Sequence, residues 1–318
     1  MQPERASEQS SKPWPLQDYS AWADTCATLH LWTQVVGKIR LALSPPVNHW
    51  WGTALYVTAR GLTTSAMPWQ GGALQIDFDF IDHQLILRMS DGRAERVTLA
   101  PRSVADFYAE VMQRLRALGV DIQIWTMPVE LPDAIPFEAD NEHKSYDAVA
   151  ANLFWQQLVQ VDRVFSAFRA RYLGKCSPSH FFWGSFDLAV TRFSGQRAPQ
   201  HPGGVPHLPD AVTREAYSHE VSSLGFWPGN EMMPDPIFYS YAYPAPSGFA
   251  EAQVQPALAK YNPQLKEFVL PYEQMRQAES PDAALLEFAR STYDAASTLG
   301  DWDRAALTEA KPHLHSRR

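Results

Sequence analysis

The hydrophobic pattern of the chain follows two periods, one typical of helices and one typical of strands. Apolar residues recur every three or four positions in four segments, and side chains with this spacing share one face of a helix. These segments predict helices over residues 24–43, 104–118, 147–173 and 281–299. Ser103 and Ser280 are suited to cap the second and fourth helices, and Pro45-Pro46 would end the first.

Between these helices, apolar and polar residues alternate, which is typical of half-buried strands. Ile76-Asp77-Phe78-Asp79-Phe80 is the clearest case, and Asp91-Gly92 predicts a hairpin turn after it. Strands are expected over residues 53–60, 76–80, 84–89, 93–99, 122–125, 181–193, 214–222, 237–243 and 268–270. Each half of the chain therefore reads as helix, antiparallel meander, helix, and the predicted fold class is α+β with two such units packed together.

Short motifs are repeated between the two halves and suggest an internal duplication. The repeated pairs are Leu31-Trp32-Thr33-Gln34 with Phe154-Trp155-Gln156-Gln157, Trp51-Gly52 with Trp183-Gly184, and Val57-Thr58-Ala59-Arg60 with Val190-Thr191-Arg192. A duplication would place Arg60 and Arg192 at equivalent positions in the two units.

The expected domain organisation follows from these units. It comprises a disordered N-terminus (1–17), a first α+β unit (18–127), a Pro-rich linker (128–144), a second α+β unit (145–307) and a polar tail (308–318). The cleft between two packed units is a natural place for a ligand.

Charge and composition narrow the function classes. The net charge of −8 at pH 7 argues against broad nucleic-acid binding, which requires Lys and Arg to neutralise phosphates. The longest uncharged run, between Arg40 and Arg60, is broken by two prolines, so no membrane span is expected. Cys26 and Cys176 are too few for a disulfide scaffold and are expected to be free thiols. A cytoplasmic location is the simplest interpretation.

Four longer motifs resemble a family of bacterial proteins known only as a domain of unknown function. They are Thr28-Leu29-His30-Leu31-Trp32-Thr33-Gln34, Asn48-His49-Trp50-Trp51, Phe181-Phe182-Trp183-Gly184-Ser185-Phe186-Asp187-Leu188 and Tyr217-Ser218-His219-Glu220. The resemblance covers residues 14–307 and implies a single-chain, stand-alone bacterial protein. It implies no activity and no catalytic residues.

Histidines and acidic residues gather in the second half of the chain. His180, Glu215 and His219 are candidate metal ligands, because His and carboxylate groups suit Zn²⁺ or Fe²⁺. Without a metal, His219 or His180 would move a proton and Glu220 would orient the histidine. The alternative is that these histidines are ordinary loop and core residues.

A pocket for an anionic or polar ligand is the second hypothesis. Arg60 and Arg192 would orient an anionic group, because guanidinium presents a planar fork to carboxylate or phosphate. Trp51, Trp183 and His49 would line the same pocket. The alternative is local ion pairing of both arginines, with Asp77 or Asp79 and with Asp187 or Glu215.

Two strand faces offer further candidates. Tyr239, Tyr241 and Tyr243 share one face of a strand, where they could bind a sugar, a flat cofactor or a partner, or pack against a neighbouring element. Asp77 and Asp79 share another face and suit a cation or an acid–base pair, or simply a solvated surface.

The sequence favours a protein that binds a small polar or anionic molecule between two α+β units, and it leaves open whether that protein is an enzyme. A non-catalytic interaction or chaperone-like module and a His/Glu metal-dependent enzyme are the alternatives. No glycine-rich phosphate loop, nucleophile elbow or Cys-x-x-Cys pair occurs, so no specific motif indicates a cofactor.

Overall fold

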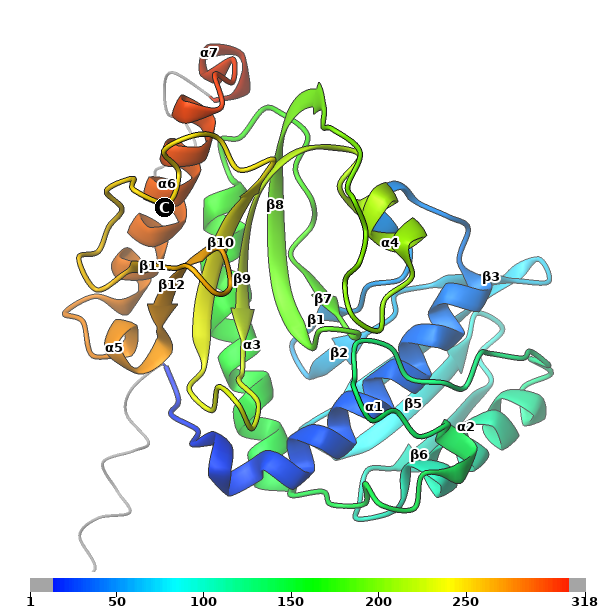
Figure 1. Cartoon of the computed structure of the whole chain (residues 1–318). Coiled ribbons are helices and arrows are strands. Elements are labelled where there is room, and N and C mark those ends of the chain that lie inside the picture. The colour runs from blue at the N-terminus through cyan, green and yellow to red at the C-terminus, as the bar shows by residue number, and fades with distance from the viewer. Residues whose placement is uncertain (1–13, 309–318) are drawn as a thin grey trace, which may run out of the picture.

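Two antiparallel sheets and the helices around them make up the fold. A computed structural model describes residues 14–308 (Figure 1). The first sheet has the order β1-β2-β4-β5-β6, with β3 beside β4. Its strands are β1 (Tyr56–Val57), β2 (Gly61–Thr63), β3 (Met67–Trp69), β4 (Gly72–Asp79), β5 (Gln84–Met89) and β6 (Ala94–Thr98).

The second sheet has the order β7-β8-β9-β10-β12-β11. Its strands are β7 (His180–Phe182), β8 (Asp187–Arg197), β9 (His219–Trp227), β10 (Ile237–Tyr243), β11 (Lys260–Asn262) and β12 (Glu267–Pro271). The α+β class expected from the sequence is therefore confirmed.

The helices are α1 (Tyr19–Leu43), α2 (Val104–Ala117), α3 (Ala148–Arg169), α4 (Asp210–Ala216), α5 (Tyr272–Arg276), α6 (Pro281–Leu299) and α7 (Arg304–Leu307), with short 3₁₀ turns η2 (Asn48–Trp50) and η3 (Phe137–Ala139). α3 and α6 pack on one face of the second sheet, and Figure 1 shows α3 behind β8, β9 and β10. The predicted caps are confirmed, because Ser103 and Ser280 each accept a hydrogen bond from a backbone N–H in the first turn.

A pair of backbone hydrogen bonds joins the two sheets. Leu55 and Phe181 exchange them, at 2.9 Å and 2.7 Å, so that the edges at β1 and β7 lie side by side. α1 contacts both halves of the chain. At Gly37 of this helix an added Cβ would lie 2.3 Å from the Trp183 ring, so only glycine permits this approach.

Alternation along the strands divides the second sheet into two faces. Leu188, Val190 and Arg192 of β8 point toward α3 and α6. The residues between them, such as Thr191, point to the other side, which we call the open face. The pairing register places Ser223, Gly225, Tyr239 and Tyr241 on this open face, beside Thr191 and Asp187.

Four of the predicted strands differ from the structure. Of the strand expected over residues 53–60, only Tyr56–Val57 forms β1. Residues 210–216 form α4 rather than the start of a strand, because Pro209 and Asp210 favour a helix N-terminus, and β9 begins only at His219. The segment 181–193 is two strands separated by a turn at 183–186. Residues 122–125 form no strand.

The structure does not confirm the internal duplication. Trp51-Gly52 precedes β1, whereas Trp183-Gly184 lies in the turn between β7 and β8. The repeated motifs thus occupy different places in their sheets.

Most of the expected disordered N-terminus and tail lies outside the described residues. Trp14, by contrast, is buried and donates a hydrogen bond to Asp282, at 2.9 Å, so the segment expected to be disordered is packed at its end.

Candidate functional site

The two arginines expected to form an anion clamp have separate partners. Arg60 lies half-exposed beside the first sheet and pairs with Asp79 at 2.6 Å and Asp82 at 2.7 Å. Arg192 points to the helix-covered face of the second sheet, where its guanidinium lies 3.6 Å from the centre of the Phe168 ring and donates to the Phe168 carbonyl. The expected clamp is therefore not formed.

His180 and Trp183 are buried structural residues in this fold. His180 Nδ1 donates to the Ala189 carbonyl at 2.7 Å, and burial lowers the pKa of the ring to about 4, which keeps it neutral. Trp183 donates to the Thr53 carbonyl at 2.9 Å. Within residues 14–308 no three His, Cys, Asp or Glu side chains are grouped to hold a metal ion, so the expected set of three ligands does not come together.

Four other predicted residues do meet, at the end of the open face. His49 donates from Nδ1 to the Ala216 carbonyl at 2.9 Å, and its backbone N–H donates to Glu215 at 2.7 Å. The His49 ring lies 5.3 Å from the ring of Trp51 and 5.7 Å from that of His219. We call His49, Lys175, Glu215 and His219 the histidine–lysine cluster.

Lys175 is the member of this cluster that the sequence did not indicate. Its Nζ lies 2.6 Å from His49 Nε2. Burial lowers the pKa values of Lys175 and His49, and the positive charge of Lys175 lowers the pKa of His49 further. Glu220, in contrast, has one carboxylate oxygen that is buried and has no hydrogen-bond partner within the described residues.

A second group of polar side chains lies on the open face at the start of β8, away from the histidine–lysine cluster. Asp187 is buried and accepts hydrogen bonds from Ser185 at 2.5 Å and from the Tyr239 hydroxyl. Tyr241 hydrogen-bonds to Tyr217 at 2.9 Å. The acid–tyrosine cluster, as we call it, consists of Glu130, Asp187, Tyr239, Tyr241 and Glu267.

A glycine allows Tyr239 to reach Asp187. β9 lies between β10, which carries Tyr239, and β8, which begins at Asp187. Gly225 of β9 lies beneath the tyrosine ring, and a Cβ there would be 2.1 Å from Cζ of Tyr239. Without a side chain at 225, the ring lies across the strand and its hydroxyl donates to the buried carboxylate.

Asp187 repels the other two carboxyl groups of this cluster, Glu130 and Glu267. Burial raises the pKa values of Glu130 and Glu267 to about 7, and repulsion from Asp187 adds to the effect. Burial also raises the pKa of Asp187. Within residues 14–308 no Lys, Arg or His forms an ion pair with any of the three.

Two polar residues of α1 hold the backbone around Glu130. Gln34 donates to the Val129 carbonyl and accepts from the Val129 N–H, both at 2.9 Å. His30 Nε2 lies 2.8 Å from the carbonyl oxygen of Gly184, and the Glu130 carboxyl group packs against Gly184. Glu130 itself has a φ of 60°, in the left-handed region that costs energy for a residue with a side chain. The linker is thereby fixed against the sheet.

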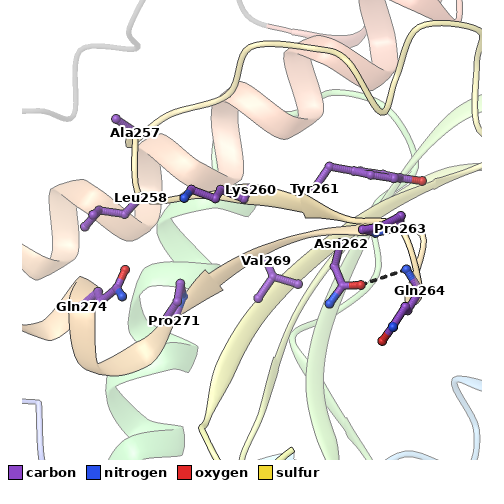
Figure 2. Close-up of a pocket in the computed structure, with 10 residues that line it drawn as sticks. All are labelled: Ala257, Leu258, Lys260, Tyr261, Asn262, Pro263, Gln264, Val269, Pro271 and Gln274. Atoms are coloured by element: carbon purple, nitrogen blue, oxygen red, sulfur yellow. Dashed lines mark hydrogen bonds between the residues drawn. The ribbon is translucent and has the colours of Figure 1, made fainter.

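A surface hollow of about 620 Å³ adjoins the open face at the edge formed by β11 and β12 (Figure 2). Val269 and Lys260 line it. Val269 pairs with Tyr239 in the sheet, and Asn262, another lining residue, pairs with Glu267. A hollow of this volume suits a small molecule. A second hollow, of about 510 Å³, lies between the start of the linker at Pro128 and the loop at His207.

Together these features define an α+β protein with two antiparallel sheets, in which one sheet face carries unpaired carboxyl groups beside tyrosines. The chain belongs to a family of unknown function, DUF5996, whose profile matches residues 14–309. This confirms the resemblance seen in the motifs. Neither the curated proteins nor the solved structures contain a match. Among the described helices, none combines the length and the apolar character needed to cross a membrane.

Proposed function

We propose that this protein binds a small polar molecule on the open face of the second sheet and exchanges a proton with it at the acid–tyrosine cluster. The observation that carries the proposal is the collection of Glu130, Asp187 and Glu267 on one side of the sheet, where no Lys, Arg or His of residues 14–308 forms an ion pair with them. A carboxyl group that is buried without an ion pair destabilises the folded state. Such groups are therefore found mainly at sites where they contact a ligand.

The protonation states suit acid–base chemistry. A pKa near the working pH lets a group both hold and release a proton, and Glu130 and Glu267, with pKa values of about 7, meet this condition. Tyr239 and Ser185 donate to Asp187 and fix the direction in which its carboxylate points. A ligand with hydroxyl or amine groups would find acceptors and donors here, and tyrosine rings would supply flat apolar surface.

The hollow at the sheet edge offers room for the rest of the ligand. It begins beside Val269, which neighbours Tyr239, and it extends toward Gln274 of α5. The molecule would thus lie over β10 and β12 with its reactive end toward Asp187. We place the protein in the bacterial cytoplasm, where its free thiols, Cys26 and Cys176, would stay reduced.

Ligand-observed NMR with a panel of sugars, polyols and amines tests the proposal. We expect at least one class to bind the wild-type protein. Tyr239→Phe removes the donor to Asp187, and Glu267→Gln removes an ionisable group, so each should weaken binding about tenfold or more. Asp91→Asn, in the turn between β5 and β6, is the matched control and should bind as the wild type does. Equal binding by all four proteins would refute the proposed site.

A further inference from the structure

Lys175 and His49 form a hydrogen-bonded pair outside the acid–tyrosine cluster. A backbone carbonyl can only accept, so the bond to Ala216 requires a proton on Nδ1 of His49. In the neutral ring, Nε2 then presents its lone pair to Lys175 Nζ, 2.6 Å away. The amine therefore has a proton acceptor in direct contact.

Aromatic rings and charges surround this amine. Its nitrogen lies 5.3 Å from the centre of the Trp51 ring and 4.9 Å from that of Phe193. Glu215 of α4 bonds the backbone of His49 through one oxygen, and its other oxygen is buried without a partner within the described residues. On the sheet side lies His219, whose pKa is lowered by burial and by the positive charges of Lys175 and Arg197, so that Arg197 brings a further positive charge to this side of the cluster. The pair is thus enclosed by neighbours from η2, α4 and β8–β9.

The backbone that carries His49 is strained. His49 and Trp50 have φ values of 57° and 60°, and each left-handed residue with a side chain costs about 1–2 kcal/mol. Glu215 holds the His49 N–H, and the Trp50 indole donates to the Val212 carbonyl at 3.0 Å, so α4 maintains this conformation. Strain of this kind is found where a side chain must be presented at a fixed place.

We propose that Lys175 is a reactive amine that forms an imine with a small carbonyl compound, with His49 Nε2 as its proton carrier. The neutral nitrogen attacks the carbonyl carbon, an N–C bond forms, and the π electrons of the carbonyl move to oxygen. Both amine protons then leave with that oxygen as water, carried by His49, and a C=N bond remains. A carbonyl compound with a carboxylate fits best, because the positive charge of Arg197 lies on the same side.

Trapping with glyoxylate, an aldehyde that carries a carboxylate, tests this assignment on the full chain. The imine is reduced with cyanoborohydride at pH 7, and modified lysines are mapped by peptide mass spectrometry. Because desolvation beside rings and an imidazole lowers the pKa of Lys175, we expect labelling ~10-fold faster than at the exposed Lys266. His49→Gln should reduce the Lys175 rate to that of Lys266.

Two controls separate reactivity from folding. Lys266→Arg should leave the Lys175 rate unchanged, and Lys175→Arg should abolish the fast label with an unchanged circular dichroism spectrum. A second measurement, the pH profile of acetic anhydride labelling in the wild type, needs no variant and should give Lys175 the lower apparent pKa of the two lysines. Equal rates or equal pH profiles at Lys175 and Lys266 would overturn the assignment, whatever the result for the open face.

Discussion

Gly225 decides whether Tyr239 can lie across the sheet to Asp187. Any side chain at this position would occupy the place of the phenol ring, because even a Cβ would lie 2.1 Å from Cζ. The cluster thus depends on a residue that offers no functional group of its own. The sequence could not reveal this role, since it follows from the register between β9 and β10.

Gly225→Ala should therefore expel the Tyr239 ring from the open face. We expect ligand affinity to fall about tenfold or more, as for Tyr239→Phe, and the free energy of unfolding to drop by about 1–3 kcal/mol. Isothermal calorimetry and urea denaturation measure the two effects. Ser222→Ala, on the same strand but on the helix-covered face, is the matched control, because it adds no atom and leaves the open face unchanged. If both variants behave alike, the role of Gly225 is wrong.

Glu130 should make stability depend on pH. Its pKa is raised to about 7, so the folded state binds a proton more tightly than the unfolded state, where the pKa is close to 4.5. The contribution of this group to stability is then full below about pH 4.5 and is lost as the pH rises to 7.

Glu130→Gln cannot ionise, so it removes the fall in the free energy of unfolding that accompanies deprotonation of Glu130. We expect the variant to be more stable than the wild type by about 1–3 kcal/mol at pH 8 and equal to it at pH 4.5, after allowance for partial exposure. Thermal unfolding at both pH values measures the difference. A constant difference across this range would show that Glu130 titrates normally.

At the scale of elements, α1 carries more than a hydrophobic stripe. It is buried on all sides from Leu31 to Arg40, and within that stretch Gln34 satisfies both backbone groups of Val129. This single side chain ties the linker to the helix and sets the position of Glu130. A polar residue on an otherwise apolar helix was the only sign of this role in the sequence.

Gln34→Leu keeps the volume and leaves the N–H and C=O of Val129 buried without partners. We expect the free energy of unfolding to fall by about 2–4 kcal/mol. Gln156→Leu is the matched control, because Gln156 occupies the repeated motif on α3 and is exposed, so its replacement should cost less than about 0.5 kcal/mol. Chemical denaturation of the two variants compares them, and equal losses would contradict the positioning role.

Capping residues and hydrophobic periodicity predicted which helices and strands exist better than they predicted where each one begins and ends. The caps of α2 and α6 lie where Ser103 and Ser280 indicated, because capping depends on a few adjacent residues. The alternation of Glu215, Tyr217 and His219 suggested a strand, yet the helical turn at α4 prevailed over it. Periodicity over a few residues does not distinguish these states when a tertiary contact, here with η2, decides between them.

At the scale of the molecule, the candidate sites depend on contacts between distant segments. His49, Trp51, Glu215 and His219 were singled out by residue type, and the structure brings them together. The sequence did not indicate Lys175, Glu130 or Glu267, because each lies in a segment without a motif of its own. The apparent equivalence of Arg60 and Arg192 came from a short repeat that the sheets do not share.

The two predicted units share α1, so the second should not fold by itself. Phe154 of α3 packs against Trp22, and Trp183 packs on Gly37. A fragment of residues 145–307 would expose the side chains that pack on α1 and would lose the backbone hydrogen bonds between Leu55 and Phe181. We expect it to lack cooperative thermal unfolding by circular dichroism, whereas the full chain unfolds cooperatively. A fragment with a sharp transition would show that the halves are independent domains.

The titration of the carboxyl groups tests the central claim most directly. In ¹³C NMR of the ligand-free protein, the side-chain carboxyl signals of Glu130 and Glu267 can be assigned with Glu130→Gln and Glu267→Gln and followed from pH 3 to pH 9. An unpaired, buried acid–tyrosine cluster predicts midpoints of about 7 for both groups. Midpoints near 4.5, the ordinary value for glutamate, would mean that both groups are solvated and that the open face holds no proton-exchanging site.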